Sequence, residues 1–242
     1  MMERLRDRRS WIAAARAVAF AGALASSLAG VSAQSGAVKP APAALVIDQT
    51  TARVNGDLIL KSEILWNLAL LKNVAPSQFW DAKTQDQMLR TLIDQRLILL
   101  EAAKLPSIRV SDEEVAKAVS ELRDEFNSPD DPQRFERRGQ LVGLTGPRLN
   151  EIVRARLRIT KFVDFRFRTF VVVTEPEMQR YFDTELRTAP EMQGLTEAAL
   201  KAAFEANRGT IEKILIEEKV NAAIDTFLEE ARVRAEIVRL DT

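Results

Sequence analysis

The chain of 242 residues contains no histidine and no cysteine. Their absence excludes Ser–His and Cys–His nucleophile pairs, zinc sites of the usual Cys/His type and disulfide bonds. It also excludes an imidazole acting as a general base or as a pH switch near neutrality. Phosphate-loop, dinucleotide-binding and calcium-loop motifs are missing as well. We therefore expect no catalytic residue, no metal site and no cofactor, although carboxylates, lysines and hydroxyls remain.

Glycine and proline are scarce, at nine residues each, which argues against a loop-rich or low-complexity chain. Hydrophobic residues make up 46% of the sequence, and the length allows one domain or two small ones. An excess of one charge is also missing, since 35 Lys and Arg balance 35 Asp and Glu. A dedicated nucleic-acid-binding protein normally has a basic excess, so the composition argues against one.

The N-terminus has the order of features of a secretory signal. Residues 4–9 hold four arginines, residues 11–28 form an apolar run, and small residues end at Ala33. We expect a signal peptide at 1–33, cleaved near Ala33-Gln34. Its removal leaves 30 basic and 33 acidic residues, so the exported chain of 209 residues is mildly acidic.

Two other interpretations of the N-terminus stay open. The apolar run could remain as a membrane anchor, but it is short for a spanning helix of roughly 20 residues and Arg16 interrupts it. Arg8-Arg9 faintly resembles a twin-arginine signal. We treat both as variants of the export hypothesis.

The first part of the exported chain predicts a flexible leader, a hairpin and three helices. Residues 34–44 are small and proline-containing, and Asn55-Gly56 predicts a type I′ turn between strands at about 45–54 and 57–60. Helices are expected at about 63–73, at about 84–104 and after residue 111. Their predicted caps are Ser62 for the first helix, a Thr84/Gln87 capping box for the second and a Ser111/Glu114 capping box for the third.

The second part predicts further helices and a closing strand. A short helix holds Phe135, Leu141 and Val142, and a long one spans about 148–169. Thr174 and Glu177 form another capping box, and residues 187–195 are expected to be a linker. Thr196 then opens a helix that Gly209 is expected to break, and a final helix follows at about 211–232. The tail 233–240 partly alternates, which suits a third strand completing the hairpin.

Several segments in this order resemble the SurA-type periplasmic chaperones. The similar segments are VNGDLILKSE (54–63), LIDQRLILLE (92–101), VSDEEV (110–115) and the long helix ending in VTEPEM (148–182). The resemblance covers about residues 45–182, with a matching helix and strand at 211–240. It implies a mainly α fold, a SurA-like helical chaperone core with a small N-terminal β-hairpin completed by a C-terminal strand.

One departure from that family stands out. Its members normally carry one or two parvulin prolyl isomerase domains of about a hundred residues, and their sites typically use histidine. Here only about 183–210 is available. The expected organisation is a core at 45–186, a short linker at 187–195 in place of the parvulin domain, and C-terminal helices and strand at 196–242 that complete the core. The resemblance therefore implies a chaperone and not an enzyme.

Aromatic side chains are the candidate client-binding residues. Phe162, Phe165, Phe167 and Phe170 fall within nine residues, and exposed aromatics can capture apolar client segments. Core packing is the favoured interpretation for Phe162 and Phe165, whereas Phe167 and Phe170 near the helix end fit either. Trp66 and Trp80 are further candidates, for which core packing is again favoured.

Basic side chains cover one face of the long helix. They could steer anionic partners, but a solvated face or pairing with acidic helices is favoured, and glutamates 217, 218, 229 and 230 offer partners. The carboxylate pairs Asp130-Asp131 and Glu113-Glu114 lie at a loop and at a helix start, so we do not interpret them as a glycosidase pair.

The resulting hypothesis is an ATP-independent periplasmic holdase without prolyl isomerase activity. Its partners, as the resemblance implies, are unfolded polypeptides, mainly precursors of outer-membrane β-barrels, with no nucleic acid, no metal and no membrane contact beyond the signal peptide. The alternative is an exported scaffolding protein with one dedicated folded partner. A prolyl isomerase is a third possibility, which would require a parvulin domain within 183–210.

Overall fold

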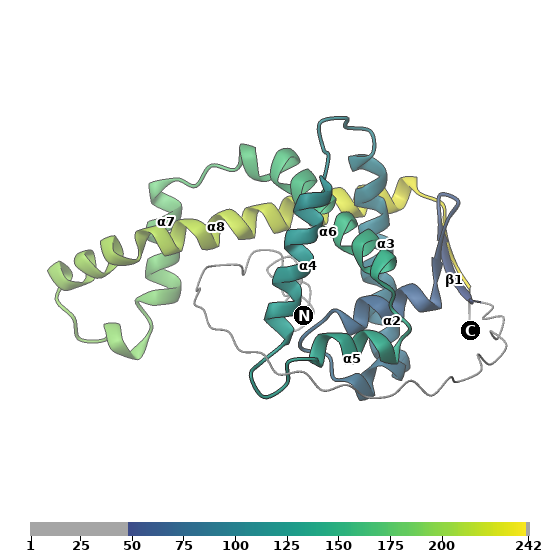
Figure 1. Ribbon diagram of the computed structural model, residues 1–242. Helices are drawn as coiled ribbons and strands as arrows, with labels where there is room; N and C mark the ends of the chain where they lie inside the picture. Colours follow the sequence, from purple (N-terminus) through teal and green to yellow (C-terminus); the bar gives the residue numbers. More distant parts are fainter. Residues whose placement is uncertain (1–47, 241–242) are drawn as a thin grey trace, which may run out of the picture.

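A computed structural model describes residues 48–240 (Figure 1). The predicted signal peptide 1–33, the leader 34–44 and the start of the predicted first strand, residues 45–47, lie outside the described residues. Within the described part, no helix is both long and apolar enough to cross a membrane.

The described chain is mainly helical with one small sheet, which confirms the expected fold class. Its strands are β1 (Thr50–Val54), β2 (Asp57–Leu60) and β3 (Ile237–Arg239). The helices are α2 (Lys61–Ala69), α3 (Ala82–Ala102), α4 (Asp112–Phe126), α5 (Arg134–Leu141), α6 (Gly146–Arg166), α7 (Glu175–Tyr181) and α8 (Glu197–Arg234). Shorter turns are η1 (Pro76–Trp80), η2 (Arg168–Phe170), the π-helical η3 (Phe182–Leu186) and η4 (Pro190–Met192).

The sheet joins the two ends of the described chain. Its order is β2-β1-β3, and both pairs are antiparallel. Asn55 and Gly56 have φ values of 48° and 92°, the left-handed geometry that a type I′ hairpin turn requires. The Asn55 side chain also accepts a hydrogen bond from the Glu236 amide at 2.8 Å. The hairpin and its completion by a C-terminal strand are thus confirmed.

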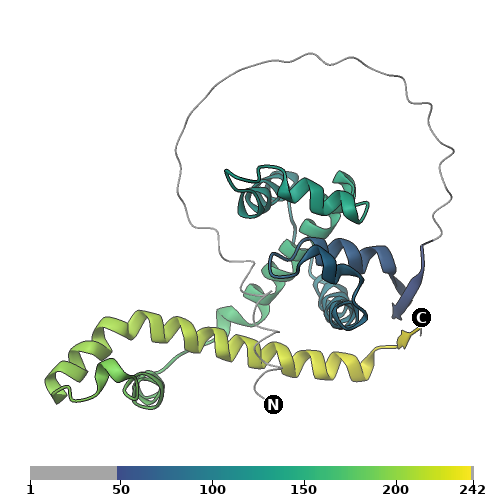
Figure 2. The ribbon, with the colours of Figure 1, turned by 90° about the horizontal axis from the view of Figure 1, so that it is seen from below.

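The apolar side chains form three clusters. The largest lies among the sheet, α2, α3, the second half of α6 and the second half of α8. A second cluster joins α4 and α5 to the first half of α6. The third joins α7 and η3 to the first half of α8. We call residues 173–215, which carry the third cluster, the arm, and the rest the body; Figure 2 shows the arm projecting from the body.

Two predicted caps are wrong. The first described helix, α2, begins at Lys61 directly after β2, so Ser62 lies inside the helix and its hydroxyl donates to Asp48. Helix α3 begins at Ala82, and the side chain of Asp81 accepts from the Thr84 amide at 2.8 Å. The capping boxes at Ser111/Glu114 and Thr174/Glu177 are confirmed.

Helix α8 corrects the expected break at Gly209. It runs without interruption for 38 residues, from the arm into the body (Figure 1). Phe204 and Ile211, on either side of Gly209, are buried in the same cluster. This packing holds the helix together across the glycine, because tertiary contacts outweigh a weak local propensity.

Candidate client-binding surface

Residues 165–172, which we call the junction, carry three large exposed apolar side chains. They begin in the last turn of α6, include η2 and lead toward α7. The exposed fractions are 51% for Phe165, 73% for Phe170 and 71% for Val172. Core packing was expected for Phe165, and this expectation is wrong: Phe165 lies in the last turn of α6, after Phe162 and Val163, the last buried residues of the helix. The junction therefore gathers three exposed apolar side chains within eight residues, a feature that can mark an interaction site.

The other two phenylalanines of the predicted set face inward. Phe162 is buried, and Phe167 is half-buried against the largest cluster. Both rings contact Phe227 of α8, with centroids 6.0 Å and 5.7 Å from it, and they lie 6.0 Å from each other. These edge and tilted ring contacts anchor the junction to α8.

The extended residues after η2 alternate between the two apolar clusters and solvent. Val171 packs against the cluster of the body, and Val173 packs against the cluster of the arm. Val172, between them, points to solvent. Successive side chains of an extended backbone point to opposite sides, so anchoring Val171 and Val173 keeps Val172 exposed.

Ion pairs hold the two ends of the junction to α8. Arg168 donates to both carboxylate oxygens of Glu217, at 2.6 Å and 3.0 Å, and to Asp164 at 2.7 Å. These bonds raise the pKa of Arg168. A bidentate pair of this kind fixes orientation as well as distance.

Lys219 makes the second connection. Its Nζ donates to the Val172 carbonyl at 2.7 Å and to Glu177 at 2.9 Å. Glu177 also accepts from the Thr174 amide and hydroxyl at 2.8 Å and 2.9 Å. The Lys219 hydrogen bond, followed by those from Thr174, lowers the pKa of Glu177 to about 2. The backbone on both sides of Val172 is thus held in place.

The two tryptophans do not join this surface. Trp66 is half-buried, and its Nε1 donates to the Val142 carbonyl at 3.0 Å, with the Arg148 guanidinium above its ring. Arg148 lies in the first turn of α6, whereas the junction follows the last turn, roughly 25 Å away along the helix axis. Trp80 is 61% exposed at the end of η1, so core packing does not describe it.

Part of the basic face of α6 is paired, one of the two structural roles favoured from the sequence. Arg154 pairs with Asp112 at 2.5 Å, and Lys161 pairs with Glu114 at 2.6 Å. Arg156 donates to the buried Asn67 side chain at 3.1 Å, and burial lowers the pKa of Arg156 to about 10. Among the glutamates of α8 that the sequence offered as partners, Glu217 pairs with Arg168, just after the end of α6.

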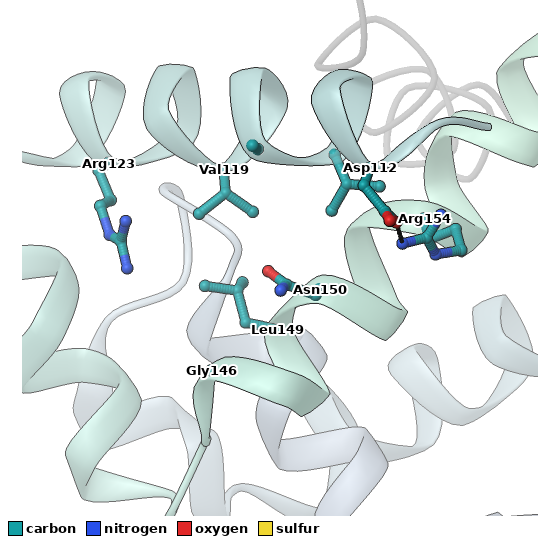
Figure 3. Close-up of a pocket in the computed structure, with 9 residues that line it drawn as sticks. Asp112, Val119, Arg123, Gly146, Leu149, Asn150 and Arg154 are labelled. Carbon is teal, nitrogen blue, oxygen red and sulfur yellow. Dashed lines mark hydrogen bonds and ion pairs between the residues drawn. The ribbon is translucent and has the colours of Figure 1, made fainter.

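A hollow lies between α4 and the start of α6 (Figure 3). It has a volume of about 390 Å³, with Val119 and Leu149 along it and Asn150 pointing into it. At its two ends, Arg154 is paired with Asp112, and Arg123 is paired with Glu136 at 3.4 Å. Its apolar residues belong to the cluster that joins α4 and α5 to α6, so we interpret it as part of the packing between these helices and not as a ligand site.

Three residues that shape the surface did not emerge from the sequence as site residues. Val172 is one of three consecutive valines, and an alternating pattern could have marked it. Phe227 has the helical spacing of core residues, but that spacing does not indicate that its ring contacts Phe162 and Phe167. Lys219 depends on contacts across 42 residues to Glu177, which no local pattern reveals.

These features define the class of protein: a mainly α domain with a small three-stranded sheet and exposed apolar side chains at the junction, beside a projecting arm. The chain belongs to the SurA-like N-terminal domain family, whose model matches residues 1–163, two thirds of the sequence. The family is periplasmic and binds unfolded proteins generally. A comparison with curated proteins gave no match. The family match ends within α6, so the junction, α7 and α8 lie beyond it.

Proposed function

We propose that the protein is an ATP-independent periplasmic holdase that binds unfolded polypeptides through the junction. The observation that supports it is the exposure of Phe165, Phe170 and Val172 within eight residues. The preferred clients are precursors of outer-membrane β-barrels, whose strands alternate apolar and polar residues. Such clients expose many apolar side chains along the chain, so a small apolar surface can bind any of several segments without recognising one sequence.

The charged hydrogen bonds of the junction support this role because they hold its backbone against α8 while its apolar side chains are exposed. Arg168 and Lys219 hold the backbone on both sides of Phe170 and Val172. Turning this backbone so that Val172 faces inward would therefore break a charged hydrogen bond. Each large side chain covered by a client contributes roughly 1.5–3 kcal/mol at full burial, so weak and reversible binding is expected from three.

We also propose that the protein lacks prolyl isomerase activity. Only fifteen residues separate the end of α7 from the start of α8, and they form short turns. A domain of about a hundred residues does not fit in this interval. A standard proline-peptide assay should give the uncatalysed rate, and acceleration would contradict this part of the proposal.

Aggregation of an unfolded β-barrel protein tests the binding proposal. The exported chain, from Gln34, should suppress aggregation at micromolar concentration without ATP. The triple variant F165S/F170S/V172S should lose most of this effect because it removes the exposed apolar area. The matched control L58S/V233S changes side chains that are 50% and 88% exposed away from the junction, and it should act as the wild type does.

Two results would overturn the proposal. One is that the exported chain binds no unfolded chain at micromolar concentration, and the other is that the triple variant and the control lose activity equally. A scaffolding protein would instead bind one folded partner and ignore unrelated unfolded peptides, so a panel of such peptides separates the two functions.

Export is proposed through the signal at 1–33. Expression of the full sequence in a Gram-negative host should give a periplasmic form whose N-terminal residue is Gln34. A form that stays in the membrane fraction with Met1 intact would indicate an anchor instead.

A further inference from the structure

A groove beside α5, remote from the junction, carries a concentration of positive charge. Its volume is about 530 Å³, and its lining includes three arginines of one short helix, Arg134, Arg137 and Arg138. Asp131 is the carboxylate of the lining, and it pairs with Arg137. Three guanidinium groups against one carboxylate leave the groove positive.

The three arginines differ in how they are held. Arg138 is 3% exposed, and its Nε and Nη2 donate to four backbone carbonyls, two of them at 2.9 Å and one at 2.8 Å. Its guanidinium also lies against the rings of Phe79 and Phe126, at 5.0 Å and 5.2 Å. Arg138 is therefore a fixed positive charge in the lining of the groove, with its Nε and Nη2 already bonded to the backbone.

Among the described residues, no ion pair neutralises the positive charge of Arg134. Its side chain is exposed and has no ion pair with any other residue between 48 and 240. Burial lowers the pKa of Arg138, and the nearby charge of Arg134 lowers it further. A guanidinium in this position can make two parallel hydrogen bonds to a carboxylate.

Apolar atoms form the other part of the lining. Leu141, 58% exposed, and Pro76 flank the arginines. A bare anion would use only the charges, whereas an acidic side chain beside an apolar one would use both parts. A groove of this size holds about two side chains, within the roughly 300–1,000 Å³ of ordinary ligand sites.

We infer that this groove binds acidic–apolar segments of polypeptides, with Arg134 and Arg137 holding the carboxylate and Leu141 and Pro76 contacting the adjacent apolar side chain. The assignment rests on the proposed function only in taking the partner to be a polypeptide. It adds a second binding surface with a charge preference to the apolar junction.

Fluorescence anisotropy on the exported chain tests the inference with three labelled ten-residue peptides. One repeats Glu-Leu, one repeats Gln-Leu and one repeats Lys-Leu. The wild type should bind the Glu-Leu peptide at least about fivefold more tightly than the Gln-Leu peptide at low salt, and the preference should shrink in salt.

Two variants locate the effect. R134Q/R137Q should abolish the preference, and R134E/R137E should transfer it to the Lys-Leu peptide. The control R180Q/K201Q removes the same charge from exposed positions of the arm and should keep the preference. Arg138 is left unchanged because its loss would disturb folding.

The outcomes separate this inference from others. Equal binding of the Glu-Leu and Gln-Leu peptides by the wild type, or an unchanged preference in R134Q/R137Q, overturns it. Complete competition by millimolar inorganic phosphate or by phosphatidylglycerol vesicles would assign the groove to phosphate groups instead. If the junction variant loses aggregation suppression but keeps the preference for the Glu-Leu peptide, both proposals are supported. If the wild type fails to suppress aggregation but keeps this preference, only the holdase proposal is refuted.

Discussion

Arg138 is a buried cation whose hydrogen bonds to described residues all go to backbone carbonyls. Its partners are Leu68, Ala69, Leu71 and Val74, in and just after the last turn of α2. The last carbonyls of a helix lack intrahelical partners and carry partial negative charge. One guanidinium thus ends α2, connects it to α5 and fills the space between two phenylalanine rings.

We predict that R138M destabilises the protein by about 2–4 kcal/mol. Methionine keeps much of the volume, but it leaves several buried carbonyls without a donor. Urea unfolding followed by circular dichroism measures the change. R134M is the matched control, because it removes an exposed arginine of the same helix, and it should shift the free energy of unfolding by less than about 0.5 kcal/mol. Equal effects of the two variants would refute the role of Arg138.

Glu177 should make stability depend on pH in acid. Its pKa is about 2 in the folded protein and 4.5 ordinarily, so the folded state favours the ionised carboxylate. The stabilisation is fully present above pH 4.5 and is lost as the pH falls toward 2. The difference in unfolding free energy between wild type and E177Q should therefore shrink over this interval. A difference that stays constant from pH 6 to pH 2 would contradict it.

At the scale of elements, Gly209 offers a direct test of α8. It lies inside the helix, and a Cβ added there would meet no atom within 4 Å. G209A should raise the free energy of unfolding by about 0.5–1 kcal/mol, because alanine loses less backbone entropy in a helix. G56A is the contrasting variant, since φ is +92° at that position, and it should destabilise by about 1–2 kcal/mol. A destabilised G209A would mean that the helix bends or opens at this residue.

Local signals predicted local structure well. The Asn55-Gly56 turn and the Ser111/Glu114 capping box depend on neighbours within three residues, and both are present. Ser62 failed as a cap because β2 runs directly into α2, where the Lys61 amide donates to Gln49 across the strand end. The third strand was predictable from its alternation, although not its register.

Long-range packing set the limits of prediction for the candidate surface. The spacing of Phe162 and Phe165 placed both on one helix face, but α6 ends one residue after Phe165, beyond the contacts that bury Phe162. The pairing of Arg168 with Glu217 and of Lys219 with Glu177 spans more than 40 residues each. No periodicity in one segment reports on such partners. Core packing was thus predicted correctly for Phe162 and wrongly for Phe165, and the sequence did not decide between burial and exposure for Phe167 and Phe170.

At the scale of the whole molecule, the orientation of the arm depends on a few charged contacts. Arg168 and Lys219 fasten the junction, and Arg208 pairs with Glu175 at the start of α7. The arm has its own small apolar cluster, so it does not need the body to bury its side chains. Charged contacts near solvent are weak individually, and these should control position more than stability.

We predict that R168Q/K219Q broadens the distribution of distances between arm and body while changing the unfolding midpoint little. The absence of native cysteine permits clean spin labelling at K117C on α4 and K201C on α8. Double electron–electron resonance measures the distribution. R90Q removes an exposed pair within α3 and serves as the control. An unchanged distribution in R168Q/K219Q would show that helix α8 alone positions the arm.

The pairing of β3 with β1 also determines when the sheet can be completed during folding. Arg53 of β1 meets Glu236 across 183 residues of sequence, so the pair cannot form until nearly all of the described chain has been made. Until then the hairpin lacks its third strand, and Ile59, Leu92 and Leu97 lack the second half of α8 above them. Contacts between distant parts of a sequence slow folding. The largest apolar cluster of the body therefore stays open until the C-terminal half of α8 is present, so a shortened chain that ends before Val220 should expose this cluster.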